Sequence, residues 1–234
     1  DMIKNISLLI KKFTEKKISY SYGGIDSLII KIFKNKRNGF YVDLGCGNPI
    51  KNNNTYQLHR KFNWSGINID LDKDNIKLFE ISRPADENVI AAVSDSFKET
   101  NLFFYHSKSS LNTISKVNAE YQKAKVNKSL KVNTITLNSI LEKSKFNTNE
   151  IDFLSIDVEG SELPILKNLN FKKYNAKVIV VEYLDLSLPV LEIKNLKIEN
   201  IINSELYQFM ISNNYSLANV LHSDLVFINN NFRD

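Results

Sequence analysis

The chain has 234 residues, of which 43% are hydrophobic and 24% charged, proportions that are ordinary for a globular protein. The single cysteine, Cys46, excludes an intramolecular disulfide and suits a reducing compartment, so we expect a cytoplasmic location. No run of about 20 uncharged apolar residues occurs, which predicts no membrane span. The net charge of +5 comes from scattered lysines, which disfavours a nucleic-acid partner but still favours an anionic substrate.

The first 38 residues precede the first predicted strand and begin with the basic, apolar stretch DMIKNISLLIKKF. This stretch lacks a small-residue cleavage site, so we interpret it as a helix rather than a signal peptide. We expect residues 1–38 to form a helical segment that caps the ligand pocket and residues 39–234 to form the main domain.

Short apolar strands and helices alternate along the main domain. FYVDL (40–44) predicts a buried strand, and a helix capped by Asn54 or Thr55 follows it to about residue 62. A turn at Ser65-Gly66 is expected to lead into a second strand that ends at Asp70. Further strands are expected at 89–93, 153–158 and 178–183, with helices at 72–81 and 161–169. A helix at 205–214 precedes a closing pair of strands, 216–221 and 224–229. This order indicates an α/β fold with a mostly parallel sheet and helices on both faces.

A polar stretch interrupts the alternation between LFFY (102–105) and LKVNTITL (130–137). We interpret residues 106–129 as an insertion, part helix and part loop, near the edge of the sheet. The turn between the last two strands is short, so one of them is expected to be antiparallel.

The first predicted strand has an acid, Asp43, next to its last residue, and two glycines, Gly45 and Gly47, follow the strand. In open α/β sheets ligands bind beyond the carboxyl ends of the strands, and Gly45 and Gly47 let the backbone turn there and approach a ligand closely. A dinucleotide fingerprint needs a third glycine where Ile50 stands, and no phosphate-binding Gly-Lys-Ser/Thr follows. Asp43 and Asp70, at the ends of two successive strands, suit the amino group and ribose of S-adenosylmethionine. An ordinary strand–turn with an acidic cap is the alternative.

The stretch IDVEGSE places a second group of acids after a strand. Asp157 ends the strand, Glu159 lies on the turn, and Glu182, at the end of the next strand, is expected to face the same cleft. Converging carboxylates can orient sugar hydroxyls, act as a base or hold Mg²⁺, so a metal site formed by these three stays open. Ser161 and Glu162 can alternatively cap the following helix.

Histidines are few, and each has a different setting. His222 lies in the turn between the last two strands, where it is either a structural residue or a general base. His106 begins the insertion, where it can contact a substrate. His59 falls in the middle of a helix and is expected to be structural.

The ordered motifs carry a resemblance to a known family. The motifs are IDVEGSELPIL followed by KVIVVEY, together with NPIKNNNTYQLHRKFNWSGINID, RPADENVIAAVSD, SSLNTISK and VNTITLNSIL. With these motifs the chain resembles the FkbM family of S-adenosylmethionine-dependent methyltransferases. The resemblance runs from about residue 19 to the end of the chain. It implies a class I (Rossmann-like) fold, with a seven-stranded, mostly parallel sheet whose last strand is antiparallel. It further implies O-methylation of a sugar, nucleotide-linked or polymer-linked, in the synthesis of a glycan such as a capsule or surface polysaccharide.

The resemblance also implies roles for individual residues. By position, the expected cofactor contacts are Gly24, Asp43, Gly45, Cys46, Gly47, Asn54, Thr55, Asp70, Leu71, Ser94 and Asp157. We expect His222 or Asp157 to act as the catalytic base. The acceptor is expected to contact His106, Asn112, Thr113, Glu159, Glu182 and Tyr183. Residues 21–26 read SYGGID where the family branch has S-Q-x-G-E-D, which leaves the contact of that element over the cofactor pocket open.

Two other classes of function stay open beside this one, namely RNA ribose methylation and a non-catalytic glycan- or nucleoside-binding module. Methylation of base amino groups is disfavoured because DVEG stands where [DN]-P-P-[FYW] is expected. Methylation of cytosine carbon is disfavoured because the only cysteine lies in the glycine turn. Assembly into a homo-oligomer is left open as well.

Overall fold

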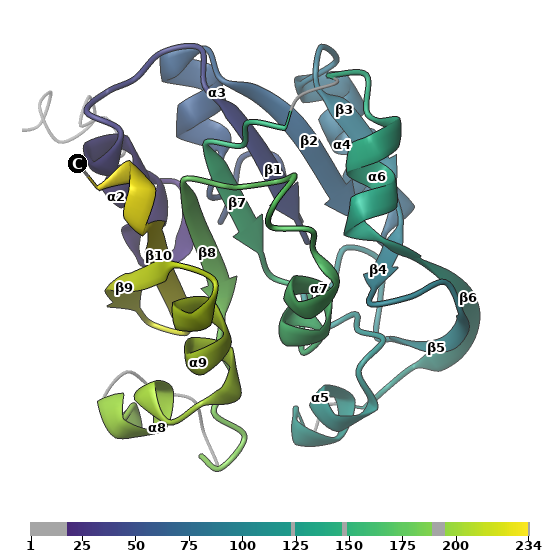
Figure 1. Ribbon diagram of the computed structural model, residues 1–234. Helices are drawn as coiled ribbons and strands as arrows, with labels where there is room; N and C mark the ends of the chain where they lie inside the picture. Colours follow the sequence, from purple (N-terminus) through teal and green to yellow (C-terminus); the bar gives the residue numbers. More distant parts are fainter. Residues whose placement is uncertain (1–17, 123–124, 147–148, 189–194, 234) are drawn as a thin grey trace, which may run out of the picture.

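The structure, a computed structural model, describes residues 18–122, 125–146, 149–188 and 195–233. The helix expected at the N-terminus therefore lies outside the described residues. A seven-stranded sheet has the order β3-β2-β1-β7-β8-β10-β9 (Figure 1). Its strands are β1 (Phe40–Leu44), β2 (Ser65–Asp70), β3 (Glu87–Ile90), β7 (Phe153–Ile156), β8 (Val178–Glu182), β9 (Tyr215–Leu221) and β10 (Asp224–Asn229).

The pairing within this sheet confirms the predicted architecture. Strands β3, β2, β1, β7 and β8 are parallel to one another, whereas β10 is antiparallel to both of its neighbours, β8 and β9. The last strand of the chain is thus the antiparallel one, and it lies inside the sheet rather than at its edge. The strand order reverses between β1 and β7, which is where an open α/β sheet binds its ligand.

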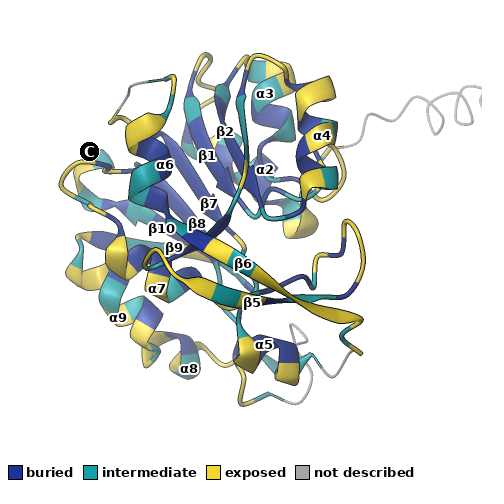
Figure 2. Ribbon diagram, turned by 90° about the vertical axis from the view of Figure 1, so that its right-hand side faces the viewer, coloured by how far each residue is buried: buried dark blue, intermediate teal, exposed yellow. Residues whose placement is uncertain are grey.

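Helices cover both faces of the sheet, as predicted (Figure 2). One face carries α2 (Ile25–Ile32), α3 (Tyr56–Phe62) and α4 (Lys73–Ser82); the other carries α6 (Leu137–Lys143), α7 (Glu162–Asn168) and α9 (Glu205–Ser212). A short helix, α8 (Ile198–Ile202), precedes α9. None of the described helices has the length and apolar character needed to cross a bilayer.

Side-chain alternation along β1 divides the core into two. Val42 and Leu44 join the cluster that contains Ile165 of α7 and Met210 of α9. Tyr41, between them in sequence, joins the opposite cluster with residues of α2 and α3. Successive residues of a strand point to opposite faces, so one short apolar strand supports both helical layers.

The strand expected at 89–93 is in fact two strands in different sheets. After β3 the backbone N–H of Ala91 donates to the carbonyl of Asp70, and the chain then leaves the main sheet as β4 (Ala92–Ser94). β4 pairs with β6 (Lys128–Thr136), which pairs with β5 (Glu99–Phe104). This second sheet lies beside the first, with α5 (Lys116–Tyr121) next to it (Figure 1). Helix α5 and its loops occupy the expected insertion.

Candidate active site

A cavity of about 560 Å³ lies at the carboxyl end of the parallel strands, at the β1–β7 reversal. A volume of this order suits a small molecule or cofactor. The loops after β1, β2, β3 and β7, the end of β8, the β9–β10 turn and the insertion all contribute to its wall. The lining residues include Tyr22, Leu44 to Asn48, Lys51, Asn52, Asp70, Leu71, Asn75, Ala91 to Val93, Lys108 to Ser110, Asn112, Ile114, Asp157 to Glu159, Glu182 and His222 to Asp224.

The glycine turn after β1 forms one side of this cavity. Gly45 and Gly47 both have left-handed backbone conformations, with φ of 78° and 57°. A Cβ atom on Gly45 would lie 1.6 Å from the carbonyl oxygen of Asp157, so only glycine allows this loop to approach the end of β7. A Cβ on Gly47 would meet no atom closer than 4.0 Å, so glycine there serves the backbone conformation alone.

Asp70 is held at the cavity wall by three donors. Its carboxylate accepts from the backbone N–H of Gly47 (2.9 Å), the backbone N–H of Asp72 (2.7 Å) and the Asn75 side-chain amide (3.1 Å). Burial raises the pKa of Asp70 to about 6, against the lowering effect of the two N–H groups. Leu71 and residues 91–93 add apolar wall beside it. A carboxylate next to apolar surface is suited to the ribose and base of a nucleoside.

Asp43 and Thr55 lie behind the glycine turn rather than on the cavity wall. The Asp43 carboxylate is buried and accepts from Thr55 Oγ1 (2.8 Å) and from the side-chain amide of Asn53 (3.2 Å). Asn54 donates to Ser155 Oγ at 3.1 Å and does not line the cavity either. The structure thus places Asp43, Asn54 and Thr55 in a supporting position beneath the turn rather than among the residues that line the cavity.

A buried arginine that the sequence analysis overlooked organises this support. Arg83 is 1% exposed and donates through Nη1 to Thr55 Oγ1 (2.8 Å) and through Nη2 to Pro49 O (2.6 Å) and Asn53 Oδ1 (2.8 Å). It thereby ties the asparagine-rich loop after β1 to the C-terminal end of α4. An arginine next to a proline in a chain that otherwise prefers lysine was the available signal, because bidentate bonding requires a guanidinium.

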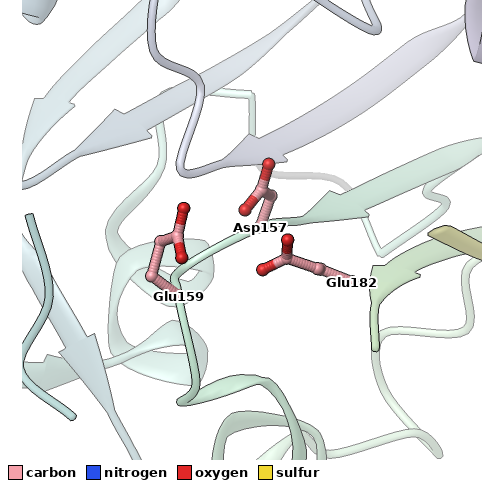
Figure 3. A group of neighbouring side chains, drawn as sticks. All are labelled: Asp157, Glu159 and Glu182. Atoms are coloured by element: carbon pink, nitrogen blue, oxygen red, sulfur yellow. The ribbon is translucent and has the colours of Figure 1, made fainter. Parts of the chain in front are cut away.

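The acids predicted to converge do meet at the cavity (Figure 3). Asp157 and Glu159 lie on the turn after β7, and Glu182 lies at the end of β8. One carboxylate oxygen of each lies within 4.8 Å of the others. Asp224 also lines the cavity, because it begins the antiparallel strand and pairs with Glu182. The sequence analysis missed Asp224, although an antiparallel strand necessarily starts at the edge where its parallel neighbour ends.

Burial and mutual repulsion act on these carboxyl groups together. Burial, followed by the charge of Asp157, raises the pKa of both Glu159 and Glu182. Desolvation by the surrounding cavity wall raises the pKa of Asp157 to about 6, although its side chain is the most accessible to solvent of the three. The pKa of Asp224 is raised to about 7 for the same two reasons, burial and Asp157. The group therefore favours any partner that brings positive charge or donates hydrogen bonds.

Glu162 has a structural role in the turn before α7 rather than as a cap of that helix. Its carboxylate accepts from the backbone N–H groups of Val158 (2.9 Å) and Gly160 (3.0 Å), and so it closes the turn that carries Glu159. The side chain of Ser161 makes no capping hydrogen bond.

His222 lies at the cavity, in the β9–β10 turn. Its Nδ1 is 3.1 Å from Ser223 Oγ, and its ring packs edge-on against Tyr22 with 5.0 Å between centroids. Tyr22 is the contribution of residues 18–38 to the wall, whereas Gly24 does not line the cavity. His59, half-buried on α3, lies 3.9 Å from Asp86, away from the cavity.

The expected acceptor contacts divide into lining and supporting residues. Asn112 lines the cavity while its side chain bonds to the backbone of Tyr105 (2.9 Å) and His106 (2.9 Å). Thr113 is fully buried and donates to the carbonyl of Glu159 at 2.7 Å.

Three further expected contacts point elsewhere. Tyr183 reaches the carbonyl of Asn200 at 3.3 Å, and Ser94 donates to its neighbour Asp95 at 3.0 Å. His106 is exposed at the start of the insertion. The structure does not place Thr113, Tyr183, Ser94 or His106 on the cavity wall.

Comparison with known proteins identifies a family whose model matches most of the chain. The model of the family described as "Methyltransferase FkbM domain" matches residues 43–216. No curated protein matches the chain. Among solved structures, the chain is similar to a TehB-like SAM-dependent methyltransferase from Corynebacterium glutamicum, with 11% identity, 97% of each chain covered and a TM-score of 0.39.

Proposed function

Because the chain belongs to the FkbM methyltransferase family and is therefore an S-adenosylmethionine-dependent methyltransferase, we propose that it methylates a hydroxyl group of a sugar. The acceptor in this proposal is a nucleotide-linked or polymer-linked sugar in the synthesis of a capsule or surface polysaccharide. Cys46, the single cysteine of the chain, is a free thiol, which suits a cytoplasmic enzyme.

The observation that carries the proposal is the chemical difference between the two ends of one cavity. At one end, Gly45, Gly47, Asp70 and Leu71 offer close backbone, a carboxylate and apolar surface, which fit the cofactor. We assign Cys46 to the same end, with Asp43, Asn54 and Thr55 supporting the turn from behind. The other end is lined by carboxylates, which accept hydrogen bonds from sugar hydroxyls.

The chain's own residues then have two tasks, alignment and proton removal. When bound, the cofactor supplies a methyl group on a sulfonium, and the C–O bond to the acceptor forms as the C–S bond breaks. His222 and Asp157 both line the cavity, and either can take the proton that the hydroxyl loses. Asn112, Glu159 and Glu182 hold the acceptor in line, and alignment supplies most of the acceleration.

Two lysines favour an acceptor that carries negative charge. Lys51 and Lys108 line the same cavity, and Lys108 is anchored by its backbone N–H to Asp72 Oδ2 at 2.6 Å. A diphosphate linked to the sugar would be attracted to this rim. The same rim would attract RNA, so the acceptor test includes both.

The test has two stages, cofactor binding and acceptor identification. Calorimetry is expected to show one S-adenosylmethionine bound per chain, with much weaker binding by Asp70→Asn. Incubation with a panel of nucleotide sugars, oligosaccharides and RNA, read by mass spectrometry, is expected to add one methyl group to a sugar. Absence of cofactor binding would reduce the chain to a binding module, and methylated RNA ribose would replace the sugar as acceptor.

Cofactor affinity is expected to depend on pH through Asp70. Its pKa of about 6 in the folded protein means that the carboxylate loses its charge, and with it one acceptor site, as the pH falls below that value. The neighbouring groups that act on it are the backbone N–H groups of Asp72 and Gly47 and the Asn75 amide, which lower its pKa, and the charge of Asp72, which raises it. The dissociation constant is expected to be about tenfold higher at pH 5 than at pH 7. Calorimetry of Asp70→Asn, which cannot titrate, should show no such change.

A further inference from the structure

We propose that Asp157, Glu159 and Glu182 form a binding site for one hard divalent cation, of the Mg²⁺ or Mn²⁺ type. The site lies at the acceptor end of the cavity. Cation binding itself does not depend on the identity of the acceptor; only the role of the cation in catalysis rests on the proposed function.

The spacing of the three carboxylates suits a single ion. One oxygen of each lies within 4.8 Å of the others, and in Figure 3 the three groups point toward one another. Two oxygens bound on opposite sides of a cation at 2.0 to 2.6 Å lie about 4 to 5 Å apart, so one ion can contact all three. The donors are carboxylate oxygens from three side chains without any cysteine or histidine, which selects hard cations over zinc or copper.

A separate observation shows that the cluster lacks a positive partner. Glu182 Oε2 is buried and has no hydrogen-bond partner among the described residues. No lysine, arginine or histidine in the described part of the chain forms an ion pair with Asp157, Glu159 or Glu182. A buried, unpaired carboxylate oxygen is costly, and a cation between the three groups removes that cost.

Neighbouring side chains hold Glu159 in position, as the outer shell of a metal site does. Its Oε2 accepts from the amides of Asn118 (3.0 Å) and Gln122 (2.8 Å). Its carbonyl oxygen accepts from Thr113 Oγ1 (2.7 Å) and again from Asn118 (2.7 Å). Hydrogen bonds of this kind orient a ligand before the ion arrives. Two contacts to the carboxylate and two to the backbone carbonyl, all from the insertion, thus fix Glu159 in position.

A cation at this position would also give the three carboxylates a function in catalysis, namely to hold an ion that activates the acceptor hydroxyl. An acceptor hydroxyl bound to it would lose its proton more readily, with the proton passing to His222, while the ion itself keeps its charge. The carboxylates that hold the ion would then not need to serve as the base.

The test measures binding of Mn²⁺ to the full chain without cofactor, by the loss of the electron paramagnetic resonance signal of free Mn²⁺. One ion per chain is expected, displaced by Mg²⁺ and removed by EDTA. Glu182→Gln should weaken the affinity at least tenfold. The control Glu120→Gln, which changes an exposed acid on α5 that pairs with Lys116, should leave it unchanged.

Thermal unfolding separates loss of the site from loss of the fold. In EDTA, Glu182→Gln should melt at a higher temperature than the unaltered chain, because repulsion between the carboxylates is reduced. Addition of Mn²⁺ should raise the melting temperature of the unaltered chain and leave the melting temperature of Glu182→Gln unchanged.

Two results would overturn the cation site: no Mn²⁺ binding at millimolar concentration, or equal binding by the unaltered chain, Asp157→Asn and Glu182→Gln. If the chain methylates a sugar equally well in EDTA and binds no Mn²⁺, the cation site fails while the proposed function stands. If Mn²⁺ binds as expected but no sugar is methylated, the cation site stands and the proposed function fails.

Discussion

Gly45 and Arg83 determine the shape of the site although neither offers it a reactive group. Gly45 brings the loop after β1 against the carbonyl of Asp157, at a distance that leaves no room for a Cβ atom. Arg83 fixes the loop that follows the glycine turn by hydrogen bonds to Pro49, Asn53 and Thr55. Residues of this kind act through the backbone positions that they impose.

Replacing the two glycines of the turn by alanine should give unequal losses of stability. Gly45→Ala is expected to lower the free energy of unfolding by about 3 kcal/mol or more, since the clash with Asp157 adds to the left-handed backbone strain. Gly47→Ala should cost about 1 kcal/mol, from the backbone conformation alone. Urea unfolding measures both. Equal losses would show that the turn can move away from β7.

Removal of Arg83 should be among the most destabilising single changes in the chain. Arg83→Met removes the donor to the buried Pro49 carbonyl and the positive charge near the buried Asp43 carboxylate, and should cost about 3 to 5 kcal/mol. The matched control is Arg37→Met, which removes an exposed arginine with one bond to Lys61 O and should change stability by less than about 0.5 kcal/mol. Similar urea midpoints for the two variants would contradict this role.

At the scale of elements, the loop before α5 forms a wall of the site, and α5 holds Glu159 through Asn118. The insertion contacts the turn after β7 through Asn118 and Gln122. It contacts the start of α4, which follows β2, through Ser107 and Lys108. These bonds join two strand ends that are not neighbours in the sheet. The insertion is therefore part of the candidate active site, and its polar composition reflects contacts to backbone and carboxylates.

Loss of the α5 cap should affect both stability and the carboxylate cluster. Ser115 Oγ accepts from the backbone N–H of Asn118 at 3.2 Å, and Ser115→Ala should lower the free energy of unfolding by about 1 kcal/mol. Because Asn118 holds Glu159, Mn²⁺ affinity should fall as well. Ser204→Ala removes the equivalent cap of α9, where Tyr207 N–H donates at 3.2 Å, and should lower stability by a similar amount without changing Mn²⁺ affinity.

At the scale of the whole molecule, charge is distributed between the two edges of the sheet. At the carboxyl edge, Asp157, Glu159, Glu182 and Asp224 form no ion pair with any described residue, whereas the opposite edge contains an ion cluster around Asp152. The Asp152 carboxylate accepts from Lys36 Nζ (2.7 Å), Lys177 Nζ (2.7 Å) and the backbone N–H of Phe40 (3.0 Å). Segments before β1, β7 and β8 are thereby joined, and the cavity edge is left free to bind its ligands.

This cluster should contribute stability that disappears in acid. Although burial opposes it, hydrogen bonds from Lys177, Lys36 and Phe40 hold the pKa of Asp152 below its usual range. A lowered pKa gives stability that is present above the unfolded-state value, about 3.9, and is lost as the pH falls through the lower folded value. Asp152→Asn should therefore cost about 1 to 2 kcal/mol at pH 7 and progressively less below pH 4. Melting curves at successive pH values measure the difference, and a constant gap would contradict it.

The sequence by itself determined the main sheet and the convergence of acids at one edge of it. Continuous apolar strands that alternate with helices permit few arrangements, and the carboxyl ends of parallel strands share an edge. Asp70, Asp157 and Glu182 were placed at the cavity for this reason, without knowledge of any contact. The same logic, applied to the antiparallel last strand, would have added Asp224.

Only the tertiary structure decided which of these residues reach the cavity and which support it from behind. Asp43 lies one residue before the end of β1, and Asp70 ends β2. Asp43 nevertheless bonds to Thr55 and Asn53 beneath the turn, because the pairing of side chains across loops depends on the tertiary structure. The division of 89–93 between two sheets has the same cause, since β4 is defined by its pairing with β6, which lies distant in the chain. The hydrophobic periodicity of a sequence indicates which residues are buried, but it does not indicate which distant strand or side chain packs against them.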